Sequence, residues 1–233
     1  MQIAFLRHRK KNLWNDLLSA SRRVHTRTST QDDLRHLMLR CAQPVAVVTT
    51  RIEGKASEPF QGENFHGATI SSFSSIAMYP YPTVSFSLQL PSRLASTLRA
   101  AMPSPVEHDC GSVRPHLVIN LLSSKQESLA RRFSRPDIYP HPFKGLEETQ
   151  VLMTSEGQPY LRDNLGSMSC SILKSIPLTL GHSLGVLDGD EGQVHSLRGS
   201  ELFIARVNRI EYTGEGISHS PLIYHERTFK SVK

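Results

Sequence analysis

The order of apolar and polar positions predicts many short strands and a few helices. Four apolar residues recur at the i, i+3, i+4, i+7 spacing of one helix face: Leu34, Leu37, Met38 and Cys41. A helix is therefore expected over 31–43, with Thr30 as its cap and Pro44 as its end. Two further helices are expected over 93–101 and 125–133.

Strands are predicted where β-branched residues cluster or apolar and polar residues alternate. These segments are 45–50, 66–77, 83–88, 116–122, 151–154, 168–174, 201–212 and 221–225. Proline, glycine and polar residues mark loops at 53–64, 103–115, 134–148 and 185–199. The helices are too few and too irregularly spaced for a doubly wound sheet, so we expect a mainly β fold, a β-barrel with peripheral helices.

The positive charge of the chain is confined to its first thirty residues. The whole chain carries +6, and residues 1–30 alone hold seven Lys or Arg and one acid, Asp16. The rest of the chain is neutral, and its composition is typical of a soluble globular protein. A neutral body lacks the phosphate-neutralising surface of nucleic-acid binders, so nucleic acid is not an expected partner.

The first thirty residues resemble a targeting segment rather than part of the folded domain. They are rich in Arg, poor in acids and amphipathic, as mitochondrial transit peptides are. The alternatives are a disordered basic tail or a helix that lies on an anionic membrane, either of which leaves the protein cytoplasmic. We therefore expect 1–30 to be a targeting or disordered segment and 31–233 to form one domain. No apolar run is long enough for a transmembrane segment.

The three cysteines do not form a disulfide framework, because they are odd in number and far apart. Cys41 and Cys170 lie within apolar patterns and are expected in the core. The third, Cys110, lies near Asp109 and His116, but that spacing does not make a closed set of ligands, so no metal site is predicted.

One motif suggests a serine hydrolase. Gly181-His182-Ser183-Leu184-Gly185 matches the G-x-S-x-G elbow, with Ser183 as the nucleophile and acids and histidines downstream. The elbow requires a helix directly after the serine, whereas residues 186–192 read as a turn. A hydrolase is therefore a remote alternative.

A second candidate is the hydroxyl-rich stretch, residues 66–73, with the sequence His-Gly-Ala-Thr-Ile-Ser-Ser-Phe. Short hydroxyl side chains can donate hydrogen bonds to a phosphate or a flavin ring edge without adding bulk. Gly67 permits close backbone approach. A half-exposed strand face has the same composition, so the residues alone leave both interpretations open.

The body of the chain, about residues 34–231, resembles the flavin-reductase-like, FMN-binding family, which includes the reductase components of two-component flavin monooxygenases. Five segments carry the resemblance in order: 44–50, 67–75, 82–92, 118–133 and 221–229. Within them, 67–75 resembles the family's G-x-T-x-S-S-F-x-S, and 221–225 resembles its closing P-L-L-Y-H. The resemblance implies a split barrel that dimerises, with FMN, or FAD, near the subunit interface.

The resemblance also implies a set of flavin-binding residues. Those expected to line the ring and ribityl chain are Thr69, Ser71, Ser72 and Phe73. Those expected near the phosphate are Ser87, Leu88 and Ser92. Asn120, Ala130 and Phe133 would support the pocket, and His225 would lie at the flavin face used by the nicotinamide.

The implied reaction is hydride transfer from NADH or NADPH to flavin. The flavin carries the chemistry, so no side-chain acid or base is required and no catalytic residue is assigned. There is no G-x-G-x-x-G for a Rossmann site. The expected partners are a second copy of the chain and, in analogy with the family, a monooxygenase. A flavin-binding or structural protein of the same fold without turnover is the main alternative.

Overall fold

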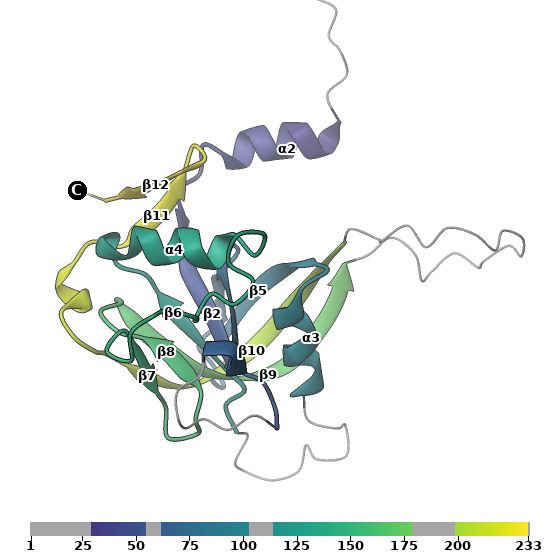
Figure 1. Ribbon diagram of the computed structural model, residues 1–233. Helices are drawn as coiled ribbons and strands as arrows, with labels where there is room; N and C mark the ends of the chain where they lie inside the picture. The colour runs from purple at the N-terminus through teal and green to yellow at the C-terminus, as the bar shows by residue number, and fades with distance from the viewer. Residues whose placement is uncertain (1–28, 55–61, 103–113, 179–198, 233) are drawn as a thin grey trace, which may run out of the picture. The chain divides into compact units, whose positions relative to one another are not determined.

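The computed structural model of the protein describes residues 29–54, 62–102, 114–178 and 199–232 (Figure 1). The chain divides into two compact units, Met1–Cys41 and Ala42–Lys233. The described part of the first unit is one helix with its flanking residues, and the second unit holds all the strands. The predicted targeting segment 1–30 and the Ser183 motif lie outside the described residues, except for residues 29 and 30.

Helix α2 (Thr30–Met38) is shorter than predicted and begins differently. Its N-cap is Ser29, not Thr30, and the Ser29 side chain accepts a hydrogen bond from the Asp32 backbone N–H at 3.2 Å. The helix ends at Met38 rather than at residue 43, so Cys41 lies beyond it. The prediction that Cys41 is a core residue is wrong, because Cys41 is exposed, whereas the prediction for Cys170 is confirmed.

The second unit contains helices α3 (Arg93–Ala100) and α4 (Glu127–Ser134), close to the two predicted ranges. Its strands are β1 (Gln43–Pro44), β2 (Ala46–Arg51), β3 (Phe65–Ile70), β4 (Ser74–Ala77), β5 (Thr83–Leu90), β6 (Leu117–Leu121), β7 (Val151–Met153), β8 (Pro159–Leu161), β9 (Gly166–Leu178), β10 (Gly199–Glu211), β11 (Leu222–His225) and β12 (Thr228–Ser231). Short 3-10 turns lie at Gly62–Asn64, Ser124–Gln126 and Gly216–Ser218.

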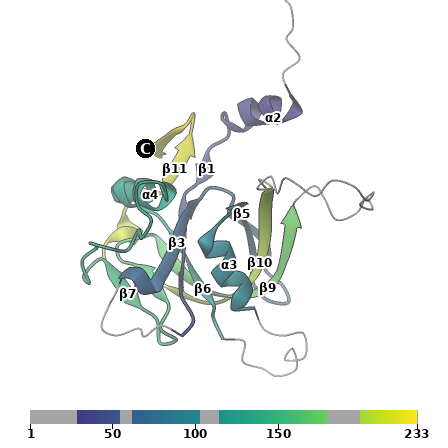
Figure 2. The ribbon, with the colours of Figure 1, turned by 45° about the vertical axis from the view of Figure 1, so that its right-hand side comes forward.

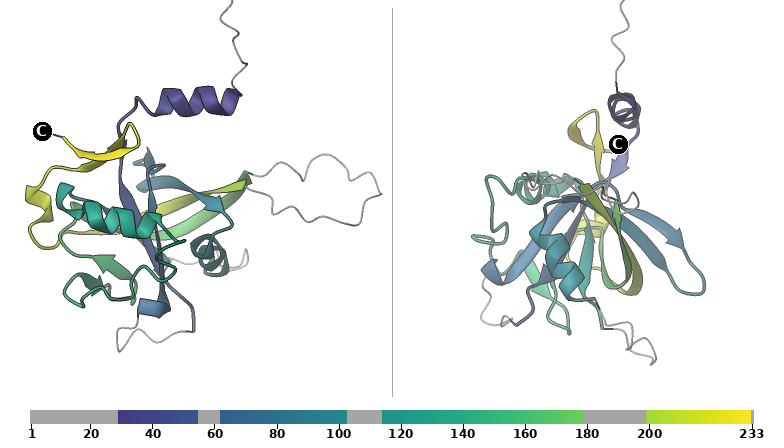
Figure 3. Two further views of the ribbon diagram at one scale, coloured as in Figure 1. Left: turned by 45° about the horizontal axis from the view of Figure 1, so that its top comes forward. Right: turned by 90° about the vertical axis from the view of Figure 1, so that its right-hand side faces the viewer.

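Seven strands form an antiparallel sheet in the order β3-β2-β6-β9-β10-β5-β4. The two edge strands, β3 and β4, are consecutive in the chain and are joined by only three residues, Ser71 to Phe73. Three residues and their flanking bonds span at most ~14 Å, so the sheet must curl until its edges approach each other. The result is a barrel that is open along one seam, between β3 and β4 (Figure 3).

Apolar side chains on the two faces of this sheet form two cores. Alternate residues of the strands point inward and pack around α3, including Val48, Phe86 and Phe203, all fully buried. The outward faces of β2 and β3 pack against α4 and the β7-β8 ribbon, with Phe133 and Phe143 at the centre of that second core. In Figure 2 the edge strand β3 lies between α4 and α3. Each helix therefore covers a different face of the strand.

The predicted fold class, a mainly β barrel with peripheral helices, is confirmed. The prediction omitted β1, β8 and β12, which are two, three and four residues long and give little periodicity. Strand β12 pairs with β11, which pairs with β1, in a small separate sheet. None of the helices in the described part of the chain has the length and apolar content to cross a bilayer.

Candidate functional site

The hydroxyl-rich stretch forms strand β3 and the three-residue crossing of the seam. The Thr69 hydroxyl faces α4 and donates a hydrogen bond to the Ala130 carbonyl oxygen at 2.7 Å. On the same face, an added Cβ at Gly67 would lie 2.6 Å from the Phe133 ring. The glycine is thus required for α4 to pack closely on β3.

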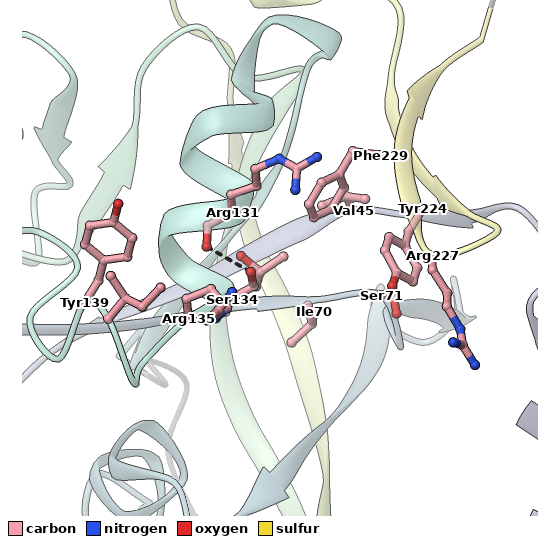
Figure 4. A pocket seen from close by; sticks show the side chains of 12 residues that line it. Val45, Ile70, Ser71, Arg131, Ser134, Arg135, Tyr139, Tyr224, Arg227 and Phe229 are labelled. Carbon is pink, nitrogen blue, oxygen red and sulfur yellow. Dashed lines mark hydrogen bonds between the residues drawn. The ribbon is translucent and has the colours of Figure 1, made fainter.

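A cavity of about 480 Å³ opens where β3 ends. We call it the hairpin cavity, because the β11-β12 hairpin forms one of its walls. It is lined by Val45, Thr69, Ile70, Ser71, Arg131, Ser134, Arg135, Ile138, Tyr139, Tyr224, Arg227 and Phe229 (Figure 4). Its volume lies in the range that encloses one drug-sized ligand.

The walls of the hairpin cavity include aromatic rings and arginine side chains. The Tyr224 and Phe229 rings pack with centroids 5.4 Å apart, and the Arg131 guanidinium lies 5.4 Å from the Phe229 centroid. Figure 4 shows Arg131 reaching from α4 toward Phe229, and Ser71 beside Tyr224. Flat apolar walls with hydroxyl and cationic groups at the edges suit a planar, anionic ligand.

A second cavity of about 490 Å³ lies at the N-terminal end of α3 and is lined by His66, Pro91, Ser92, Arg93, Ser96 and Thr97. We call it the α3 cavity. Ser92 is the N-cap of α3, and its Oγ accepts a hydrogen bond from the Ala95 N–H at 3.2 Å. A helix N-terminus with hydroxyls and an arginine around it favours an anion.

Two histidines, His66 and His141, lie close to each other near the α3 cavity. Burial, together with the charges of Arg93 and His141, lowers the pKa of His66 below the ordinary histidine value. The Nδ1 atom of His141 is buried and has no hydrogen-bond partner among the described residues. An anion in this cavity would offset the local positive charge and favour protonation of His66.

Strand β3 contributes to both cavities. Thr69 and Ser71 line the hairpin cavity, and His66 lines the α3 cavity. His66 and Thr69 are three residues apart, which is ~10 Å along a strand. The structure thus brings Thr69, Ser71 and Ser92 of the predicted site residues to two neighbouring cavities.

Other predicted site residues hold the barrel together. The Ser72 hydroxyl donates to the Ser87 carbonyl at 3.1 Å and accepts from the Ser87 N–H at 2.9 Å, so it ties the seam crossing to β5. Phe73 packs, partly buried, against the inner core, and Leu88 is a buried member of that core. Leu88 can therefore offer a ligand only its backbone.

Asn120 is fully buried and makes a hydrogen-bond network instead of lining a cavity. Its Nδ2 donates to the Val47 carbonyl at 2.9 Å. Its Oδ1 accepts from the Leu161 N–H at 2.8 Å and from the Ser167 hydroxyl at 3.0 Å. Ala130 and Phe133 are likewise buried, in the outer core behind β3.

His225 does not line the hairpin cavity. Its Nδ1 lies 3.2 Å from Lys230 Nζ and 3.4 Å from Glu226 Oε2. Because neighbouring residues of a strand point to opposite faces, the residue that faces the cavity from β11 is Tyr224.

Most residues that line the hairpin cavity were not among the predicted site residues: Val45, Ile70, Arg131, Ser134, Arg135, Ile138, Tyr139, Tyr224, Arg227 and Phe229. Arg131 lies in the last turn of α4, and Arg135 is the C-cap of that helix. Nothing local in the sequence indicates that this end of α4 meets the β11-β12 hairpin.

Taken together, the fold and the cavities define a split β-barrel with ligand cavities beside its open seam. A family model described as the flavin reductase like domain matches residues 38–233. The chain therefore belongs to the flavin reductase-like domain family.

Individual relatives agree with this assignment. The NADPH-flavin oxidoreductase of Streptomyces viridifaciens is 28% identical over 185 residues, which cover 78% of this chain and 82% of the relative. The flavin reductase of styrene monooxygenase from Pseudomonas putida S12 superposes with a TM-score of 0.55 at 21% identity, covering 86% of this chain and 97% of that one. The NADH:FAD oxidoreductase of Streptomyces globisporus C-1027 gives a TM-score of 0.59 at 18% identity, covering 88% and 93%.

Proposed function

We propose that this protein is an NAD(P)H-dependent flavin reductase whose flavin binds beside strand β3. The observation that carries the proposal is the hairpin cavity, whose aromatic and arginine walls lie in the segments that match the family. The names of the relatives, an NADPH-flavin oxidoreductase and an NADH:FAD oxidoreductase, support the reaction class.

The residues of the two cavities fit a flavin. We propose that the ring system enters the hairpin cavity between Tyr224 and the end of β3, where Thr69 and Ser71 present hydroxyl groups. The α3 cavity would take the phosphate, held by Arg93, Ser96 and the N-terminal N–H groups of α3. His66 and Thr69 lie ~10 Å apart along β3 and on its opposite faces, so a flavin that occupies both cavities would pass around the free edge of β3.

When bound, flavin supplies the redox chemistry by accepting a hydride from NADH or NADPH. The chain's own residues would bind and orient the two rings. The aromatic walls would pack against the apolar part of the ring, and the hydroxyl groups of Thr69 and Ser71 would lie at its edge. We assign no proton transfer to a side chain.

Replacing Arg93 with glutamine tests the position of the phosphate. We expect the Kd for FMN to rise at least ~tenfold, because a hydrogen bond to a charged group is lost. The Kd for riboflavin, which has no phosphate, should stay within ~twofold. Fluorescence titration with both flavins measures this. An equal loss for the two flavins would place the phosphate elsewhere.

We also propose that the protein is a homodimer that covers the exposed edge strand β4. Ile76, Met78 and Tyr79, in and just after β4, are 53%, 63% and 89% exposed. Edge strands with apolar side chains are usually covered by another chain or element. A two-fold partner at β4 would also close the seam beside Ser71 and Ser72.

The substitution Ile76→Lys should convert the dimer to a monomer in light scattering. Each copy loses ~1.5–3 kcal/mol of apolar burial, and two-fold symmetry doubles the loss. The matched control is Ile217→Lys, at another isoleucine of similar exposure, 62%. A monomeric wild type, or a dimer that survives Ile76→Lys, contradicts the proposed interface.

Two further points extend the proposal. The flavin reductase of styrene monooxygenase and the flavin reductase component of a two-component tryptophan halogenase are among the structural neighbours, so we propose a partner monooxygenase that receives the reduced flavin. We further propose that residues 1–30 direct the protein to mitochondria, on the basis of their arginine-rich, acid-poor composition. A fluorescent reporter fused to these residues tests this second point, and diffuse cytosolic signal contradicts it.

A further inference from the structure

The arginines of the hairpin cavity differ in their partners. Arg131 pairs with Glu127 at 2.6 Å, and Arg135 pairs with Asp137 at 2.8 Å. Both charges are thus offset locally. Arg227 makes no ion pair with a described residue, and its neighbour Glu226 pairs with Lys230 at 2.6 Å. Within the described residues that line the cavity, Arg227 is the cation whose charge is not offset.

Arg227 lies at the rim of the cavity. Figure 4 shows it beside Ser71 and Tyr224, with its guanidinium directed outward and away from Arg131. Its side chain is exposed. It is therefore placed to meet the part of a ligand that projects from the cavity, and not the part enclosed by the aromatic walls.

The turn that carries Arg227 is held in an uncommon backbone conformation. Glu226 and Arg227 connect the paired residues His225 and Thr228, and their φ angles are +51° and +62°. A two-residue turn with two positive φ angles favours Asn-Gly, because long side chains are disfavoured there. A turn of this shape with Glu-Arg in place of Asn-Gly is consistent with a role for these side chains.

The size of the cavity limits what it can enclose. About 480 Å³ accommodates one drug-sized ligand, not a flavin together with a whole dinucleotide. If the nicotinamide end approaches the flavin, the adenosine end must lie at or beyond the rim. NADPH differs from NADH only by a phosphate on the adenosine 2′ position, and a planar guanidinium binds a phosphate monoester through two parallel hydrogen bonds.

We infer that Arg227 binds a nucleotide phosphate monoester at the rim of the hairpin cavity, namely the 2′-phosphate of NADPH, and that it makes the enzyme prefer NADPH to NADH. This inference rests on the proposed flavin reductase function. The 5′-phosphate of FMN is the other source of the same chemistry, and the experiment separates the two.

The first arm measures binding without turnover. Adenosine 2′,5′-bisphosphate and 5′-AMP, which differ only in the 2′-phosphate, are titrated calorimetrically into the full chain. The wild type should bind the bisphosphate at least ~tenfold more tightly, and Arg227→Gln should remove this difference. Arg227→Lys keeps the positive charge but lacks the planar guanidinium that makes two parallel hydrogen bonds, so it should retain part of the affinity difference. Equal affinity of the wild type for the two nucleotides overturns the inference.

The second arm measures kcat/KM with NADPH and with NADH. Arg227→Gln should lower the NADPH:NADH ratio of kcat/KM at least ~tenfold, mainly by raising the KM for NADPH and not that for NADH. The matched control is Arg114→Gln. It removes the same charge from an exposed residue that lines neither cavity and that precedes the first residue of β6, Leu117. Its ratio should equal that of the wild type. An unchanged ratio in Arg227→Gln overturns the inference.

The remaining outcomes separate this inference from the proposed function. If Arg227→Gln weakens FMN but not riboflavin, the arginine binds the flavin phosphate and the assignment to NADPH is overturned. If the wild type oxidises neither NADPH nor NADH, the proposed function is wrong. The nucleotide titration alone then decides whether Arg227 binds a 2′-phosphate.

Discussion

Replacing Asn120 with alanine should lower the free energy of unfolding by ~3–5 kcal/mol, the largest effect expected here. The substitution leaves the buried Leu161 N–H and Val47 carbonyl without the Asn120 amide that now pairs with them. Each unsatisfied buried group costs ~1–3 kcal/mol. Because Asn120 links β2, β6 and the start of β9, its loss should loosen the barrel and not the flavin site. Urea unfolding measures the change.

Flavin affinity distinguishes this structural role from a binding role. At a temperature where the variant is still folded, its Kd for FMN should lie within ~threefold of wild type, since Asn120 does not line either cavity. A control is Ser74→Ala, which removes an exposed hydroxyl from β4 and should barely alter stability. Normal stability with lost flavin binding in Asn120→Ala would show that Asn120 contacts the flavin.

Replacing Gly67 with alanine should lower the free energy of unfolding by ~2–3 kcal/mol. The new methyl would lie 2.6 and 2.8 Å from two atoms of the Phe133 ring. That ring is only 3% exposed and is fixed by an edge-on contact with Phe143, whose centroid is 5.0 Å away. Overpacking of this kind typically costs ~1–3 kcal/mol.

A second substitution tests whether the Phe133 ring is the cause. Phe133→Leu removes the atoms that the alanine meets, so Gly67→Ala should cost less in the Phe133→Leu background than in the wild type. We expect a coupling free energy of at least ~1 kcal/mol in the double-mutant cycle. Additive effects of the two substitutions would mean that Gly67 is required for another reason.

The sequence predicted some elements of the fold better than others. The periodicity of apolar residues predicted the long strands and α3. In β5 and β10, for example, buried and half-buried residues alternate along the strand, as expected when successive side chains point to opposite faces. The periodicity also predicted the helix α2, although not its end at Met38, but the apolar residues Leu34 and Leu37 of that helix are 57% and 62% exposed. The pattern there is helical, but it says nothing about whether the face is covered.

The hydroxyl-rich stretch borders both cavities, and the contacts of its residues depend on tertiary structure. Ser72 bonds to Ser87, which is fifteen residues away in the chain, and Thr69 bonds to Ala130, sixty-one residues away. Neither partner follows from local sequence. Thr69, Ile70 and Ser71 of this stretch line the hairpin cavity, and the wall formed by the β11-β12 hairpin comes from residues more than 150 positions further along the chain.

The central claim is that the protein reduces flavin with NAD(P)H. It is tested most directly by mixing the purified full chain with NADPH or NADH and following nicotinamide absorbance with and without FMN or FAD. We expect oxidation that depends on both enzyme and flavin, and riboflavin binding should weaken when Ser71→Trp fills the hairpin cavity. Flavin that binds without any oxidation would make the protein a silent flavin binder, and the absence of both would contradict the account.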